Sequence, residues 1–465
     1  METETKLNNT STFELATFAS TLKYEDIPEE VITKAKYLLL DYLGAMVPGN
    51  QEEMAKILYR FVNKVTGPAE SSLIGMDIKV GAQWAALYNG AVGHLIDMDD
   101  IHWGSVTHAG VCIWSSALAM AEKTNASGKE LLTAAIAGYE VALRIGLAVQ
   151  PDHYVRGFNP SGTIMTFGAA AVAARLLKLD PLKTTHALGM AAVMVAGNKA
   201  HLTERVMTKD YNSGFSSKSG ILGALLAEEG FTASTDELEN PCGFLHLYGE
   251  RAYPEELTKG FKNIWHIMKT GQKLYPACRV MHSSIDAVLD FREKFDVDKI
   301  EKITSRLFAT GAYIIDDNCP WSGEKGIMGA RFSAQYNIAV ALLYGKEGMW
   351  DLYDPVKAME YMKMERVREL IKKIQIIHVK EWDEDTSKYS ACEVDITLNN
   401  QTHFTKKLSS AFGDPDNPIP YPEQIKRFKS LLSVVGWSES RMEGVINGVL
   451  SLEDVENINK IMGYL

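Results

Sequence analysis

The sequence predicts a mainly α-helical protein, with a large helical domain followed by a smaller part that mixes helices and strands. Three observations lead to this prediction. From the N-terminus to about residue 268 apolar residues recur at helical spacing, Ala and Gly are frequent in those stretches, and β-branched, partly alternating runs begin after about residue 270. Because small side chains let helices approach closely, we expect the helical domain to be tightly packed.

The first region carries local signals for helix starts. Residues 26–44 place apolar side chains at helical spacing. Ser127 and Glu130 form a capping-box pattern ahead of an apolar run, and Asp180 followed by Pro181 supplies an N-cap and a first-turn proline. These patterns predict where individual helices begin.

The second region predicts an α+β domain. The runs IEKITSRLFAT and IKKIQIIHVK are typical of strands, and EVDITLNNQTHFTKKL indicates a hairpin around Asn399 and Asn400. The stretches HSSIDAVLDFREKF and FSAQYNIAVALLYG between them favour helices. After a proline-broken loop at 413–423 the pattern returns to helix, so the C-terminal helices could rejoin the first domain. The expected divisions are 1–268, 269–408 and 409–465, which suits a chain of 465 residues.

The composition excludes several classes of protein. Apolar and charged fractions of 46% and 23% are those of a soluble globular protein. A net charge of −11 argues against nucleic acid as a partner, because phosphate binding needs clustered Lys and Arg. The N-terminus lacks the apolar core of a signal peptide, and the best membrane candidate, 133–149, carries Glu140 and Arg144. We therefore expect a cytoplasmic protein that binds neither nucleic acid nor membrane.

The cysteines support the same location. The five are Cys112, Cys242, Cys278, Cys319 and Cys392. Their odd number, wide spacing and lack of a CxxC pair are typical of thiols in a reducing compartment, and predict neither a disulfide framework nor a zinc site.

The stretch from Gly93 to Val111 concentrates histidines and aspartates. They are His94, Asp97, Asp99, Asp100, His102 and His108. A calcium loop would need Gly and Glu where His102 and His108 stand, and the spacing matches no zinc motif. A divalent metal held by mixed Asp and His remains an alternative, while the plainer interpretation makes His94 a core residue and Asp100 a helix cap. His108 differs because it precedes an apolar run, where a helix N-terminus would lower the pKa of its imidazole.

A second segment, RGFNPSGT, is a polar turn that leads into a helix rich in small residues. Backbone N–H groups at such a start, together with the hydroxyls of Ser161 and Thr163, can bind a carboxylate or a phosphate. Ordinary capping explains the same pattern equally well, and no Walker or GxGxxG motif supports a nucleotide.

Two further segments supply cations. Lys209 stands in a Gly/Ser-rich stretch, where it could equally be a solvated surface lysine. Lys273, Tyr275, Arg279 and His282 lie close together at the expected domain junction, a common place for small-molecule sites. Cations clustered in an acidic protein suggest a ligand with carboxylates. Since no nucleophile elbow or reactive-cysteine motif is present, these groups favour proton transfer.

The segments, taken in order, resemble the MmgE/PrpD family, which includes 2-methylcitrate dehydratase, cis-aconitate decarboxylase and iminodisuccinate epimerase. The matching stretches are NGAVGHLIDMDDIHWGSVTHAG, RGFNPSGTIMTFGAAAVAARLLKLD, MTKDYNSGFSSKSGILGALLAEEGFTA, KLYPACRVMHSSIDA and ARFSAQYNIAVALL. The resemblance covers nearly the whole chain. It implies a homodimer without metal or other cofactor, in which each subunit has a large helical domain completed by the C-terminal helices, a smaller α+β lid, and the site between them.

The resemblance also assigns site residues. Asp97 and His108 match the family's D-x-D-D and T-H-P elements, Lys209 its M-T-K lysine and Lys273 its K-x-Y-P lysine. Tyr336 falls near a tyrosine that lines the pocket in some relatives.

Two departures from the family pattern affect the expected reaction. The usual GFHPTGT histidine, which helps catalysis in dehydratases and decarboxylases of the family, is Asn159 here. Asparagine can hydrogen-bond a carboxylate but does not titrate near neutral pH. T-H-P has also become T-H-A at Ala109.

The sequence thus predicts an acid–base enzyme that acts beside a carboxylate of a small di- or tricarboxylic acid. We expect a hydro-lyase of the 2-methylcitrate dehydratase type. An epimerase of an iminodisuccinate-like amino-dicarboxylate, a cis-aconitate-type decarboxylase and a non-catalytic carboxylate-binding relative are the alternatives. Either His108 or Lys273 would be the base, with the other as acid or carboxylate clamp.

The remaining expected residues bind or orient the substrate. Lys209 and Arg279 would neutralise its carboxylates, Asp97 would orient a partner, and Asn159 would position the substrate. Thr163, His282 and Tyr336 complete the expected binding residues.

Overall fold

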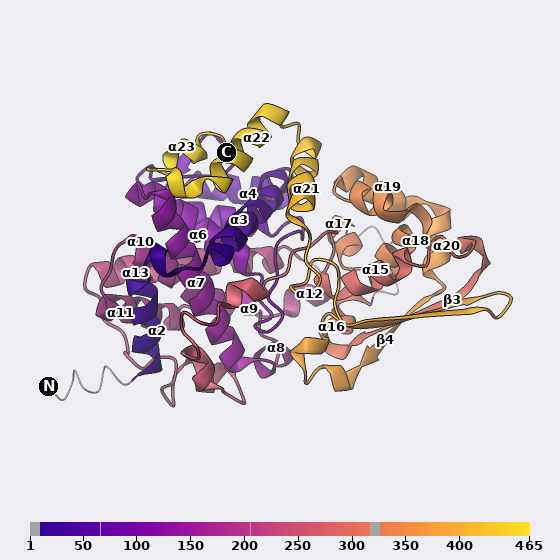
Figure 1. Cartoon of the computed structure of the whole chain (residues 1–465), viewed down its shortest axis with the longest axis horizontal. Coiled ribbons are helices and arrows are strands. Elements are labelled where there is room, and N and C mark those ends of the chain that lie inside the picture. The colour runs from indigo at the N-terminus through magenta and orange to yellow at the C-terminus, as the bar shows by residue number, and fades with distance from the viewer. Residues whose placement is uncertain (1–9, 66, 205, 317–325) are drawn as a thin grey trace.

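The computed structural model describes residues 10–65, 67–204, 206–316 and 326–465. Helices dominate, and a small four-stranded sheet lies in a separate part of the molecule (Figure 1). The predicted fold class, mainly α with a smaller α+β part, is confirmed. We call the two parts the body (α2–α14 with α21–α23) and the lid (α15–α20 with β3–β6).

The body is built from long helices that share a single apolar core. The long helices are α2 (Ser11–Thr21), α3 (Glu29–Gly49), α4 (Glu53–Val62), α5 (Ala82–Gly93), α6 (Ala109–Thr124), α7 (Gly128–Val149), α10 (Met165–Leu176), α11 (Pro181–Val193) and α13 (Thr208–Glu228). The short elements are α8 (Asp152–Val155), α9 (Pro160–Thr163), α12 (Ala200–Glu204), α14 (Phe244–Tyr248) and the strand pair β1 (Ser71–Ser72) and β2 (Lys79–Val80).

The helix starts predicted at Ser127 and Asp180 are confirmed, while the helix expected over residues 26–44 begins at Glu29. The Ser127 side chain accepts a hydrogen bond from Glu130 N, and the Glu130 carboxylate accepts one from Ser127 N, so the capping box is complete. Asp180 caps α11 by accepting from Lys183 N, and Pro181 occupies the first turn. Such bonds satisfy N–H groups that have no partner within the helix.

Small residues allow the body helices to pack closely, as predicted. A Cβ added to Gly214 of α13 would lie 2.1 Å from the carbonyl oxygen of Leu87 in α5. On the next turns of α13, a Cβ at Gly220 would lie 2.5 Å from the carbonyl oxygen of Thr166 in α10. Because no side chain fits there, glycine sets the distance between these backbones.

Helix α7 is the one described helix that is long and apolar enough to cross a membrane. Its most apolar window is 94% buried inside the protein, and Glu140 pairs with Arg144 there. We therefore interpret α7 as the central helix of the body's core.

The lid contains a four-stranded mixed sheet in the order β4-β3-β5-β6. β3 (Ile300–Phe308) runs parallel to β4 (Ile374–Val379) and antiparallel to β5 (Cys392–Leu398), which forms the predicted hairpin with β6 (His403–Leu408). The lid helices are α15 (His282–Leu289), α16 (Ala309–Ile315), α17 (Gly326–Arg331), α18 (Ala334–Asp351), α19 (Pro355–Lys363) and α20 (Glu365–Ile371). α15 packs on β5 and β6, and a second apolar core lies between helices and sheet.

The C-terminal helices return to the body. They are α21 (Tyr421–Val434), α22 (Glu439–Leu450) and α23 (Asn459–Met462). α21 and α22 pack against α3, and Phe428 and Leu432 enter the core of the body (Figure 1). The large domain is therefore completed by these helices, as the sequence predicted.

The cysteines in the described part of the chain are free thiols, namely Cys112, Cys242, Cys278 and Cys392. Cys319 lies outside the described residues.

Candidate active site

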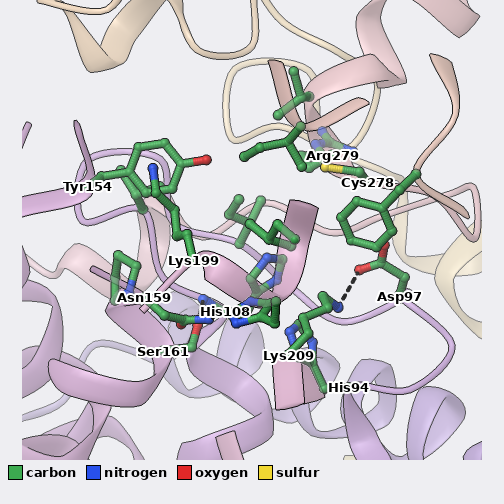
Figure 2. Close-up of a pocket in the computed structure, with 18 of the residues that line it drawn as sticks. His94, Asp97, His108, Tyr154, Asn159, Ser161, Lys199, Lys209, Cys278 and Arg279 are labelled. Atoms are coloured by element: carbon green, nitrogen blue, oxygen red, sulfur yellow. Dashed lines mark hydrogen bonds and ion pairs between the residues drawn. The ribbon is translucent and has the colours of Figure 1, made fainter. Parts of the chain in front are cut away.

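A cavity between the body and the lid brings together four distant segments of the chain (Figure 2). The segments are 94–108, 154–161, 199–209 and 273–280, and Ile314 and Phe332 from the lid complete the lining. The cavity is lined by His94, Asp97, His108, Asn159, Lys209, Lys273 and Arg279 among others. The structure thus brings the expected proton-transfer groups to one place.

Asp97 holds two lysines at one end of the cavity. Its Oδ1 lies 2.8 Å from Lys273 Nζ and 3.2 Å from Lys209 Nζ, and Lys273 also donates to the Asp97 carbonyl at 3.0 Å. Asp210 Oδ1 lies 3.1 Å from Lys209. Burial alone would raise the pKa of Asp97, but the two ammonium groups outweigh it and lower that pKa. Among the described residues Asp97 Oδ2 has no hydrogen-bond partner, so it can accept a bond from a ligand.

The backbone at Asp97 has an unusual conformation. Its φ is 58°, which lies in the left-handed region that non-glycine residues rarely adopt. This turn directs the Asp97 carboxylate to both lysines, which come from α13 and from the junction between body and lid. Backbone strain of this kind is typical of functional sites.

His108 and His94 share one carboxylate. Their Nδ1 atoms lie 2.8 Å and 2.9 Å from Asp99 Oδ2, and the ring centroids are 4.8 Å apart. His108 Nδ1 also lies 2.8 Å from the carbonyl oxygen of Asp100. With two acceptors beside it, Nδ1 carries the proton, and Nε2 keeps its lone pair. Burial and the positive charge of Lys273 together lower the pKa of His108 to about 4, although Asp99 opposes them, so the imidazole is neutral near pH 7.

Two expectations about the 94–108 segment have different outcomes. Asp100 is a helix cap, because its Oδ1 accepts from Gly110 N at the start of α6 and its Oδ2 accepts from the Tyr139 hydroxyl. His94 is buried, as the core interpretation predicts, but it also lines the cavity. The reason is tertiary, because Asp99 connects it to His108.

The ligand atoms of His94, Asp99 and His108 all lie within 4.8 Å of one another, so this group could hold a metal ion. Two features favour hydrogen bonds instead. Both histidines already contact the same carboxylate oxygen at hydrogen-bond distance. The ammonium of Lys273 is close enough to lower the pKa of His108, and it would also repel a divalent cation. We interpret the three side chains as a hydrogen-bonded triad.

The 156–163 turn satisfies its own polar groups. Asn159 Oδ1 accepts from Gly162 N, and Thr163 Oγ1 donates to the Asn159 carbonyl and contacts His153 Nε2 at 2.8 Å. The Ser161 hydroxyl accepts from His108 N. This arrangement is the capping alternative, and it leaves Asn159 Nδ2, rather than Thr163, at the cavity.

Three other expected binding residues lie in different surroundings. Arg279 lines the cavity, but its guanidinium bonds Asp414 at 2.7 Å and the Gln272 carbonyl at 3.1 Å, so its charge is already balanced. His282 contacts Arg279 and the Ala277 carbonyl, and Tyr336 donates to the Ala358 carbonyl inside the lid core. Their expected contact with substrate remains a prediction.

Lys199 and His201 line the cavity without having been expected there. His201 Nε2 lies 3.4 Å from Asn159 Nδ2. Burial lowers the pKa of His201 to about 4, and the positive charge of Lys209 acts in the same direction. The sequence GNKAHLTE offered no signal for either residue, because their role depends on contacts with segments about forty residues away.

Comparison with known families agrees with this geometry. A model of the MmgE/PrpD N-terminal domain matches residues 13–256, and a model of the MmgE/PrpD C-terminal domain matches residues 275–452. The chain therefore belongs to the MmgE/PrpD family, which confirms the resemblance noted above.

Curated relatives match over almost their whole length. A cis-aconitate decarboxylase from Aspergillus terreus is 26% identical, over 98% of this chain and 95% of the relative. Proteins with the same name from Homo sapiens and Mus musculus are also 26% identical, over 97% and 96% of this chain and 93% and 91% of their own lengths.

Proposed function

We propose that the protein is a lyase that acts on a small tricarboxylate by proton transfer beside a carboxylate, and that it decarboxylates cis-aconitate. The observation that supports the proposal most is that His108 lines the same cavity as Lys209 and Lys273, whose ammonium groups share Asp97. The names of the relatives support cis-aconitate as the substrate.

The chemistry of cis-aconitate defines what such a site must do. The CH₂–COO⁻ arm loses CO₂, and the electron pair of the broken C–C bond forms a new double bond to the central carbon. The pair of the former double bond moves to the neighbouring CH, which takes up a proton, so that 2-methylenebutanedioate results. The enzyme therefore has to stabilise negative charge that spreads into a carboxylate, and has to donate a proton to carbon.

The cavity residues fit these two tasks. Lys209 and Lys273 provide positive charge beside a carboxylate, and losing one such donor typically costs roughly 10²–10³ in rate. Because Lys273 forms an ion pair with Asp97, we assign this lysine to binding rather than to the role of base. His108 would carry the proton, since the negative charge of a bound tricarboxylate favours its protonated form.

A second candidate, dehydration of a hydroxy acid such as 2-methylcitrate, rests on the resting state of His108. With its pKa at about 4, the imidazole is neutral at pH 7 and can remove a proton at once. The electron pair of the broken C–H bond would then form the double bond, and the hydroxyl of the next carbon would leave as water with a proton returned by the His108 imidazolium.

Both reactions can be followed in one experiment. The purified protein is incubated in D₂O with cis-aconitate, and separately with 2-methylcitrate, and the mixtures are followed by proton NMR. We expect cis-aconitate to give CO₂ and 2-methylenebutanedioate with deuterium in its CH₂–COO⁻ group. An alkene from 2-methylcitrate without CO₂ would favour the dehydratase, and deuterium at an α-carbon without an alkene would favour an epimerase.

The remaining outcomes of this experiment concern inactivity and metal. No change in any substrate would contradict the proposal and favour the non-catalytic relative. EDTA should leave the rate unchanged. If EDTA abolished the rate and Mg²⁺ or Fe²⁺ restored it, His94, Asp99 and His108 would have to be interpreted as metal ligands.

A further inference from the structure

Lys199 stands apart from the other cations of the cavity. It directly precedes α12, and its ammonium lies 3.5 Å from the centroid of the Tyr154 ring. In Figure 2, Lys199 and Tyr154 lie on one side of the close-up, Lys209 and Asp97 lie on the other, and His108 lies between them. The cavity therefore has positive charge at two separate ends.

The two ends differ in how their charge is balanced. Lys209 pairs with Asp97 and Asp210, and Lys273 pairs with Asp97. Within the described residues Lys199 forms no ion pair; the face of the Tyr154 ring holds the ammonium by a cation–π contact, which does not neutralise it. Lys199 thus carries the least compensated positive charge among these lysines.

Lys199 is still charged at the pH of a cell. Burial lowers its pKa to about 8, and Asp383 of the lid partly offsets that effect. A partly buried ammonium that has no carboxylate at ion-pair distance among the described residues is unfavourable. An anion from a ligand would remove this penalty, so the position is prepared for a carboxylate.

We propose that Lys199 binds the substrate carboxylate that lies farthest from Lys209 and Lys273, and thereby makes the cavity selective for tricarboxylates over dicarboxylates. The inference rests on the proposed function for its substrate class. In this proposal Lys209 and Lys273 meet the carboxylates next to the reacting carbon, and the third carboxylate extends past His108 toward Lys199 on the other side of the cavity.

The test measures binding without turnover. Tricarballylate and succinate carry three and two carboxylates and have neither a double bond nor a hydroxyl, so neither can undergo the proposed reactions. Their affinities for the full-length protein are measured by isothermal titration calorimetry. We expect Lys199→Gln to lower the affinity for tricarballylate at least about tenfold, since it removes a charge-assisted hydrogen bond. The affinity for succinate should fall less than about threefold.

Two further variants control for charge and structure. Lys199→Arg keeps the cation and should recover most of the affinity for tricarballylate. Lys178→Gln makes the same change of net charge at an exposed lysine that pairs with Glu130, and should bind both ligands as the wild type does. If Lys199→Gln lowered the affinity for both ligands equally, or for neither, the inference would be overturned.

The result also separates this inference from the proposed function. If the binding of tricarballylate depends on Lys199 but the wild type does not convert cis-aconitate, the binding role of Lys199 stands and the decarboxylase assignment is wrong. If the wild type decarboxylates cis-aconitate but Lys199→Gln binds tricarballylate normally, the reaction stands and the role of Lys199 is wrong. A wild type that binds no tricarballylate would contradict the inference directly.

Discussion

His108 is the residue on which the proposed chemistry depends most. His108→Asn retains a donor for Asp99 and Asp100 but has no group that titrates near neutral pH. We expect kcat to fall by at least about 10², measured with cis-aconitate, while the circular dichroism spectrum and the melting temperature stay close to those of the wild type. The matched control is His246→Asn, because His246 lies exposed on α14. Wild-type turnover in the His108 variant would remove His108 from the mechanism.

Single residues of the site could be predicted only where they stand in a short sequence pattern that resembles the family. Asp97, His108, Lys209 and Lys273 stand in stretches that resemble a family, and the structure gathers all four around one cavity. His201 stands in no such stretch. Its position depends on the contact with Asn159, and nothing local in the sequence encodes a contact of that range.

Helices were predictable for a related reason. A capping box needs only residues three positions apart, so the start of α7 could be located from Ser127 and Glu130 alone. Which helices touch depends on the whole fold. The sequence predicted close packing from its small residues, but the crossing of α13 with α5 at Gly214 is known only from the structure.

That crossing leads to a prediction about α13, the helix that carries Lys209. In Gly214→Ala the new methyl group would lie 2.1 Å from the Leu87 carbonyl, a rigid backbone atom, so the helices must separate. We expect the free energy of unfolding in urea to fall by at least about 2 kcal/mol. Gly448→Ala in α22 is the control, because its methyl group meets the flexible Ile461 side chain at 3.3 Å. It should change stability by less than about 1 kcal/mol, and an equal loss in both variants would show that close approach is not the cause.

At the scale of the whole molecule, the C-terminal helix α21 is connected to the active site by hydrogen bonds of Arg427. Arg427 of α21 donates to Asp41 of α3 and to the Met98 carbonyl, each at 2.6 Å. Asp41 also accepts from Gln272, the neighbour of Lys273. Since Met98 lies between Asp97 and Asp99, this buried ion pair holds two of the segments that line the cavity, the one with Asp97 and His108 and the one with Lys273.

The ion pair between Asp41 and Arg427 leads to a prediction about stability when the arginine is replaced. Arg427→Gln leaves the Asp41 carboxylate buried without its cation, and removing one partner of a buried pair typically costs about 3–5 kcal/mol. Burial already raises the pKa of Asp41 while Arg427 opposes that shift, so the variant should raise this pKa further. A carboxyl whose pKa is higher in the folded than in the unfolded state binds more protons when folded, and its contribution to stability is lost as pH rises through that interval. The free energy of unfolding that Arg427→Gln loses relative to the wild type, measured in urea, should therefore be larger at pH 8 than at pH 5.

The double variant Asp41→Asn/Arg427→Gln separates charge from packing. It replaces both ions by neutral polar side chains, Asn close to Asp in shape and Gln shorter than Arg. We expect it to recover most of the lost stability and to show the same loss of stability at pH 5 and pH 8. Turnover should recover less than stability, because the short contact from Arg427 to the Met98 carbonyl also fixes the turn between Asp97 and Asp99. A double variant as unstable as Arg427→Gln at both pH values would mean that the arginine acts through its volume, and the electrostatic link between the C-terminal helix and the active site would be wrong.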